Sequence, residues 1–201
     1  LPSKWDAVAA DVQRLRAAQR PVLVGTRTIE DSEMLAHRLA AMGLPLQLLN
    51  GTQDATEAEI IAEAGQLGAI TVATNMAGRG TDIKLGSGVA ELGGLHVVGC
   101  ELNESGRVDR QLAGRSARQG DPGSYQLFVS ADDGAISANS TQLARRMRRM
   151  ADRSGEAASD LSPEIVKLQQ RIEVNRFSAR RQLFAHDDWV EKLVARLAQM
   201  K

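Results

Sequence analysis

The sequence predicts an α/β fold, in which a parallel sheet is covered by helices on both faces. Short, mostly apolar runs alternate with segments of helical periodicity between Val22 and Ser130. This alternation is typical of βαβ units, in which each helix returns the chain to the next parallel strand. Apolar residues make up 43% of the 201-residue chain and aromatic residues only 3%, so we expect one sizeable core filled mainly by aliphatic side chains.

A helix is predicted first, at Trp5–Gln19, where apolar residues recur at helical spacing. Pro21 ends this segment. The apolar run Val22–Val24 that follows is too short for a helix, so it predicts a buried parallel strand. Helical periodicity returns over Ser32–Met42 and stops at Gly43, a residue type that commonly ends helices. These elements form the first strand-helix repeat of the predicted sheet.

The next strand is predicted at Leu46–Leu49, and a helical segment over Ala55–Ala64 follows it. Further apolar runs predict the remaining strands, at Ala69–Ala73, Leu95–Val98 and Gln126–Val129. In parallel sheets of this kind, ligands bind beyond the carboxyl ends of the strands. We therefore expect function in the loops that follow Val24, Leu49, Ala73 and Val98.

The pattern changes after Ala131. Asp132–Ser140 is polar and without periodicity, which predicts a loop, and Ser154–Ser162 predicts a second linker. Pro163, beside the capping residue Ser162, predicts the start of one or two long helices that reach Lys201, with room for a bend near His186–Asp188. The chain thus divides into residues 1–131, a linker over 132–162 and a helical segment over 163–201. A helix in the linker carries four arginines: Arg145, Arg146, Arg148 and Arg149.

Charge and cysteine content exclude some classes of protein. The chain has 25 basic and 25 acidic residues, so no overall field attracts nucleic acid or anionic lipid. Its single cysteine, Cys100, follows an apolar run and reads as a buried, inert thiol in a reducing compartment. No stretch is long and apolar enough to span a membrane, and no signal peptide opens the chain. The start at Leu1 rather than Met suggests an excised fragment.

A glycine-rich segment follows the strand at Ala69–Ala73, with the sequence Thr74-Asn75-Met76-Ala77-Gly78-Arg79-Gly80-Thr81-Asp82. Its glycines, Gly78 and Gly80, let the backbone turn sharply and approach a ligand closely. Arg79 is a fork-shaped donor suited to phosphate or carboxylate, and Asp82 can accept two hydroxyl hydrogen bonds, as a ribose offers. An ordinary strand-to-helix turn with a surface arginine would show the same pattern.

A second segment reads Gln111-Leu112-Ala113-Gly114-Arg115-Ser116-Ala117-Arg118-Gln119-Gly120-Asp121. Arg115 and Arg118 are three residues apart, so on a helix they would share a face with Gln111 and could point at one anion. Such a pair could neutralise charge on a transferring phosphoryl group. A solvated basic helix face is the alternative interpretation.

In this order and spacing, the two segments resemble the fifth and sixth motifs of superfamily-two helicases and translocases. Residues Ala73–Ile83 are particularly similar to the SecA-type preprotein translocase ATPases. Three other stretches are similar to that family: Pro21–Thr26, Gly93–Gly99 and Gln119–Ser124. Near the end, Arg171–Phe177, Arg180–Leu183 and Asp187–Asp188 resemble the start of the family's long helical scaffold.

The resemblance implies a RecA-like second motor domain and a C-terminal helical scaffold segment. ATP or ADP with Mg²⁺ would bind between this domain and a first motor domain on the same full-length chain, which supplies the phosphate loop and the magnesium-binding acid. No Gly-x-x-x-x-Gly-Lys-[Ser/Thr] motif occurs here, so we expect the isolated chain to be inactive as an ATPase. By resemblance, Arg115 and Arg118 would contact the β- and γ-phosphates, with Arg118 the arginine-finger candidate.

The remaining roles are also implied by the resemblance. Asp82 would hold the ribose, Gln111 would help order the cleft, and the loop that senses the nucleotide would contain Gly78, Arg79, Gly80 and Thr81. The full-length protein would couple ATP hydrolysis to polypeptide translocation. Its partners would be unfolded polypeptide and a protein-conducting membrane channel, and it would lie in the cytoplasm or at the cytoplasmic face of the bacterial inner membrane.

The chain departs from the family pattern at three places, the first of which is Asn50–Thr56, where the family usually has a loop with lysine and histidine. The family usually reads Arg-Gly-Arg-Ser-Gly-Arg where this chain has Ala113–Arg118, which removes one arginine and one glycine. The family typically reads Gly-Thr-Glu-Arg-His-Glu-Ser-Arg-Arg where this chain has Gly99–Arg107, so that two arginines and a histidine are replaced by Leu102, Asn103 and Gly106. These departures leave two readings open, a divergent, accessory SecA-like protein and the housekeeping motor itself.

Two other functions remain open at this stage. The motor motifs also permit the C-terminal half of an RNA or DNA helicase, favoured by the Arg145–Arg149 cluster but disfavoured by the neutral charge and the few aromatic residues. A degenerate nucleotide-binding module without turnover is the other alternative. A metal site is not expected, because His96 and His186 have no partners at ligand spacing, and we expect His96 to be a core residue.

Overall fold

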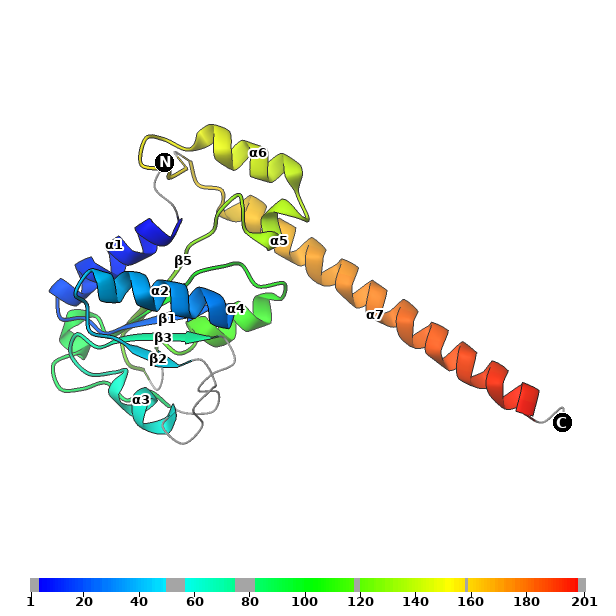
Figure 1. The fold of residues 1–201 in the computed structure, drawn as a ribbon, viewed down its shortest axis with the longest axis horizontal. Coiled ribbons are helices and arrows are strands. Elements are labelled where there is room, and N and C mark those ends of the chain that lie inside the picture. Colours follow the sequence, from blue (N-terminus) through cyan, green and yellow to red (C-terminus); the bar gives the residue numbers. More distant parts are fainter. Residues whose placement is uncertain (1–3, 50–56, 75–81, 118–119, 158, 199–201) are drawn as a thin grey trace.

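The computed structural model describes residues 4–49, 57–74, 82–117, 120–157 and 159–198. Within these ranges the side chains of residues 57, 58 and 192–198 are not described. The chain forms a layered α/β body, from which one long helix extends (Figure 1).

A five-stranded parallel sheet forms the centre of the body, with strand order β2-β3-β1-β4-β5. The strands are β1 (Val22–Thr26), β2 (Gln47–Leu49), β3 (Ile70–Thr74), β4 (Leu95–Gly99) and β5 (Gly123–Leu127). Strand β1 lies in the middle, where Val24 is opposite Val72 of β3 and Val98 of β4. Every residue of β1, β3 and β4 is buried, as the apolar runs predicted for strands covered on both faces.

Helices cover both faces of the sheet, which confirms the predicted fold class. Side chains of α1 (Lys4–Ala17) and α2 (Ile29–Ala41) pack with Val22 and Val24 in one core cluster. Leu23 points to the opposite face and packs in a second cluster with side chains of α3 (Glu57–Glu63) and α4 (Gly106–Ala113). Successive strand residues face opposite sides, so one short run can supply both cores. A single 3₁₀ turn, η1 (Ala90–Leu92), precedes β4.

The last strand begins earlier than the apolar pattern predicted. The expected strand at Gln126–Val129 is wrong at its start, because β5 pairs with β4 from Gly123, which lies opposite Leu95. The first residues of β5 include Ser124 and Tyr125, whose polar groups interrupt the apolar pattern that predicts a strand. Pairing with β4, a property of the sheet, decides where β5 begins.

A third core cluster lies beyond the sheet, beneath α5 (Gly134–Ser137), α6 (Thr141–Met150) and the start of α7 (Ser162–Ala198). The prediction of a loop over Asp132–Ser140 is wrong in part, because α5 forms there around the fully buried Ile136. Leu168 and Ile172 of α7 are buried in the same cluster, 4% and 3% exposed.

Helix α7 runs unbroken through His186–Asp188, so a single helix occupies the region where the sequence left room for a bend. Its 37 residues give a length of about 55 Å at 1.5 Å per residue. Only its first part packs on the body, and the rest extends away from it (Figure 1). On the projecting part, large apolar side chains such as Phe177, Phe184 and Trp189 are exposed.

Candidate nucleotide site

The first sequence segment lies mostly outside the described residues. Gly78, Arg79, Gly80 and Thr81 are among residues 75–81, for which the structure gives no description. Strand β3 ends at Thr74, and the described chain resumes at the half-buried Asp82. The next residue, Ile83, is 6% exposed and packs in the second core cluster beneath α3 and α4. Asp82 therefore lies beside the core layer that α4 also covers.

The second segment is divided between a helix and a turn. Gln111 is exposed on α4, which ends at Ala113. The amide of Arg115 donates to the Leu112 carbonyl at 3.0 Å, and Ser116 Oγ donates to the Ala113 carbonyl at 2.6 Å. Arg115 therefore lies just beyond the C-cap of α4, on a turn closed by hydrogen bonds to the third residue before. Arg115 is half-buried on a tight turn, and Arg118 lies outside the described residues.

The turn is held against the start of β5. A Cβ atom on Gly123 would lie 1.7 Å from the Ser116 carbonyl oxygen, so only glycine allows this approach. Because the first residue of β5 pairs with the first residue of β4, this contact lies at the end of the sheet where the strands begin. We expected functional residues in the loops that follow the strands. Arg115 does not lie in the loop after β4, because α4 separates it from that loop.

The segments share one structural layer. Ile83, next to Asp82, and Leu112, three residues before Arg115, are members of the second core cluster. Leu112 also lies over β1, because a Cβ atom added to Gly25 would be 2.6 Å from its Cδ2 atom. The structure thus places Asp82, Gln111 and Arg115 in segments that border the same face of the sheet.

The beginning of α4 makes contacts that the sequence did not reveal. Glu173 of α7 accepts a hydrogen bond from the Gly106 amide at 2.7 Å, and Gln169 of α7 donates to the Asn103 carbonyl at 2.8 Å. Glu104 forms ion pairs with Arg176 of α7 and, at 3.6 Å, with Arg27 after β1. Ser105 as an N-cap is a signal that the sequence offers, but the α7 partners of Asn103 and Gly106 are 66 and 67 residues away along the chain.

His96 is buried, as predicted, at 5% exposure, but its surroundings are polar. Arg20 donates to Ser124 Oγ at 2.6 Å, and His96 Nδ1 lies 2.7 Å from the same hydroxyl oxygen. His96 Nε2 then faces Asp11 Oδ2 at 3.6 Å. Burial lowers the pKa of His96, and the Asp11 carboxylate partly opposes this shift. No group of three metal-binding side chains occurs in the described part of the chain.

The basic helix α6 is partly neutralised. Arg146 pairs with Glu164 at 2.7 Å, and Arg148 pairs with Asp132 at 2.5 Å. Arg145 and Arg149 are exposed on the side away from the buried Leu143 and Ala144. This arrangement agrees with a solvated helix face that is anchored at its flanks. None of the helices that the structure describes is long and apolar enough to cross a bilayer.

Comparison with known sequences identifies the family. The sequence model of the SecA P-loop domain matches residues 2–89 and 87–155. Two protein translocase subunits SecA, from Desulfovibrio desulfuricans and Oleidesulfovibrio alaskensis, are each 46% identical to this chain, over 188 and 190 residues. The matches cover 92% and 93% of this chain but only 22% of each relative, so the chain spans less than a quarter of their length.

Solved structures agree on the fold. The E. coli DEAD-box protein SrmB, bound to regulator of ribonuclease activity A, aligns with a TM-score of 0.52 and 28% identity over 66% of this chain and 74% of that chain. Domain 2 of the DEAD-box helicase Mss116p, bound to an RNA duplex, aligns with a TM-score of 0.50 and 18% identity over 81% of this chain and 62% of that chain, which shows the fold alone. The RecA-like α/β fold is thereby confirmed, and the chain belongs to the SecA P-loop domain family.

Proposed function

We propose that this chain is the second motor domain, with the start of the helical scaffold, of a SecA-type ATPase that moves polypeptide across a membrane. The observation that carries this proposal is the 46% identity to protein translocase subunits SecA over more than nine-tenths of the chain. The described fold supports the proposal, because the sheet is RecA-like and the long helix α7 extends away from the α/β body, as a scaffold helix would (Figure 1). The domain limits at residues 131 and 162 are part of the same proposal.

The proposed chemistry uses residues of both sequence segments. Arg115 and Arg118 contribute positive charge to the phosphates of ATP bound against a first motor domain, and Gln111 orders the same cleft. Asp82 accepts hydrogen bonds from the ribose, beside a loop of Gly78, Arg79, Gly80 and Thr81. Mg²⁺ is held mainly by the first domain. Cleft closure brings the arginines to the γ-phosphate, and hydrolysis releases them, which shifts the population between open and closed states.

The proposed partners follow from the family. The first motor domain lies on the same full-length chain, the substrate is unfolded polypeptide, and a protein-conducting channel receives it. The protein works in the cytoplasm and at the cytoplasmic face of the bacterial inner membrane. Without a phosphate loop, the 201-residue chain on its own should not hydrolyse ATP. This expectation would be contradicted if the purified chain hydrolysed ATP and Arg118→Ala abolished that activity.

Steady-state phosphate release by the full-length protein tests the proposal. Arg118→Ala should lower kcat about a hundredfold or more, and Arg115→Ala should lower it by a similar or smaller factor. Arg153→Ala is the matched control, because Arg153 is exposed and distant in sequence from both segments. An unchanged kcat in both Arg115→Ala and Arg118→Ala would refute the proposal. Tight binding of single-stranded RNA at physiological salt would favour the helicase alternative instead.

A further inference from the structure

The start of α4 is bound by two side chains of α7. Glu173 Oε1 accepts a hydrogen bond from the Gly106 amide at 2.7 Å, and the Ser105 hydroxyl donates to the same carboxylate. These hydrogen bonds lower the pKa of Glu173, so the group is ionised at neutral pH. The first amides of a helix have no partner within it, and a negative charge is favourable at that end. A carboxylate of α7 therefore caps α4.

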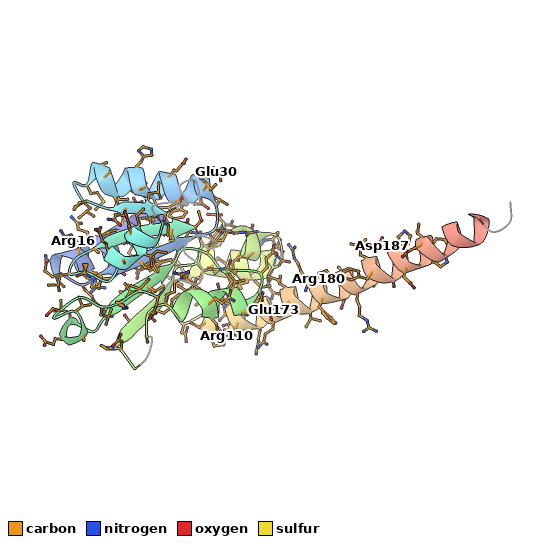
Figure 2. All side chains as sticks on the ribbon, turned by 90° about the horizontal axis from the view of Figure 1, so that it is seen from below. Arg16, Glu30, Arg110, Glu173, Arg180 and Asp187 are labelled. Carbon is orange, nitrogen blue, oxygen red and sulfur yellow. The ribbon has the colours of Figure 1, made fainter. Side chains whose placement is uncertain are left out.

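Gln169, one turn earlier on α7, holds the loop before α4. Its side-chain amide donates to the Asn103 carbonyl at 2.8 Å and to the Asp109 carboxylate. Asp109 in turn accepts from the side-chain amide of Asn103 at 2.6 Å and from its backbone amide at 3.3 Å. Asn103 and Asp109 are thus hydrogen-bonded to each other, and Gln169 of α7 is hydrogen-bonded to both. Figure 2 shows Glu173 beside Arg110 at this junction of α4 and α7.

Leu102 and Gly106 fit the space beside α7 at this junction. Leu102 is 2% exposed and packs with Leu168 and Ile172 of α7 in the third core cluster. A Cβ atom on Gly106 would lie 3.0 Å from the Gln169 side-chain oxygen, so a larger residue would press on the Gln169 side chain. An arginine in place of Leu102 would have to bury its charge, which is costly without a partner.

Helix α4 connects this junction to the proposed nucleotide residues. It contains only eight residues, and its far end carries Gln111 and, through the hydrogen bond between Leu112 and Arg115, the turn of Arg115. A short hydrogen-bonded helix moves as a unit. A displacement of α7 must therefore shift this turn or break the contacts at Gly106 and Asn103.

We propose that Glu173 and Gln169 are positioning residues that hold α4, and with it Gln111 and Arg115, in register with the scaffold helix. This inference rests on the proposed function, since it assigns those two residues to the ATP site. It gives α7 a direct mechanical connection to that site, which runs through one helix. In this role neither residue contacts the nucleotide itself.

The test uses the full-length protein with three variants of α7: Glu173→Ala, Glu173→Gln and Gln169→Ala. Glu173→Ala should lower kcat for ATP hydrolysis by about threefold to tenfold, as expected when a charge-assisted helix cap is lost. Because no nucleotide contact is removed, KM for ATP should change much less than kcat. Glu173→Gln should recover part of the loss, since an amide oxygen can still accept from the Gly106 amide. Glu191→Ala removes the same charge from an exposed position of α7 and should behave as wild type.

Hydrogen exchange gives a second readout at the junction itself. Glu173→Ala and Gln169→Ala should speed exchange of amides 106–115, while amides of α1 and α2 keep their wild-type protection. If Arg115→Ala lowers kcat but both α7 variants match wild type in kcat and exchange, the inference is overturned and the proposed function stands. If Arg115→Ala and Arg118→Ala leave kcat unchanged, the proposed function fails, and the inference with it. A loss of kcat in the α7 variants that appears only with global unfolding also overturns the inference.

Discussion

The ion pair between Lys4 and Asp133 joins the first helix to the third core cluster, and its removal has a calculable cost. Lys4 Nζ lies 2.5 Å from Asp133 Oδ1, and the two side chains are only 10% and 6% exposed. The other carboxylate oxygen accepts from the Ser130 amide at 2.7 Å. Replacing Lys4 with methionine keeps most of the stem volume but leaves a buried carboxylate with one partner fewer.

Removing one partner of a buried ion pair typically costs about 3–5 kcal/mol. The Ser130 hydrogen bond remains, so we expect Lys4→Met to lower the free energy of unfolding by about 3 kcal/mol at neutral pH. The matched control is Arg38→Met, which removes the pair between Arg38 of α2 and Asp6 of α1. That pair is 36% and 50% exposed, so its loss should cost less than about 1 kcal/mol.

The cost should depend on pH in a defined direction. Burial raises the pKa of Asp133, and the hydrogen bond from Lys4 partly lowers it, so removing Lys4 raises the folded-state pKa further. A carboxyl with a higher pKa in the folded state binds more protons there. Its contribution to stability is present below the unfolded pKa and is lost as pH rises through the folded pKa. The penalty of Lys4→Met should therefore shrink on going from about pH 7 to about pH 4.

Urea unfolding of the purified chain, followed by circular dichroism at both pH values, measures this penalty. Asp133→Asn in the Lys4→Met background removes the buried charge but keeps an acceptor for Ser130, so it should recover about 1–2 kcal/mol at neutral pH. A neutral-pH loss below about 1 kcal/mol, or a loss that stays constant on acidification, would refute the reasoning.

Two further predictions concern packing. Gly123→Ala should lower the free energy of unfolding by about 2 kcal/mol or more, because the added Cβ would lie 1.7 Å from the Ser116 carbonyl oxygen. The control Gly134→Ala, where the added Cβ would have no atom within 4 Å, should be neutral or stabilising by about 0.5–1 kcal/mol. Equal free energies for the two variants in denaturant titrations would contradict the steric explanation. Cys100 is 1% exposed and burial raises its pKa to about 12, so iodoacetamide should label it at neutral pH only as fast as the chain unfolds; rapid labelling of the native chain would be inconsistent with this burial.

Local sequence patterns predicted most of the sheet and its helices. The apolar runs at Val22–Val24, Ala69–Ala73 and Leu95–Val98 correspond to β1, β3 and β4, because strands buried on both faces need apolar residues at every position. The start of β5 and the helix α5 were missed. Ser124 and Tyr125 make the first look polar, and α5 is only four residues long, stabilised by burial of Ile136 rather than by periodicity.

The candidate site was predicted by residue type rather than by placement. Similarity to the motifs of the family pointed to Asp82, Gln111, Arg115 and Arg118, and their roles remain proposals. Arg115 does not lie within α4, because that helix ends at Ala113 and the turn that follows packs against Gly123. That contact joins α4 to a strand that lies later in the chain, so no local pattern announces it.

The sequence by itself determined the α/β class, the family and the residue types offered to a nucleotide. The tertiary structure alone decided which distant segments control those residues. Glu173 reaches the Gly106 amide across 67 positions of sequence, and Gln169 reaches Asp109 across 60. Periodicity records which face of an element is apolar, and hence its secondary structure. It carries no record of which partner that element meets, because this depends on how the completed layers pack together in space.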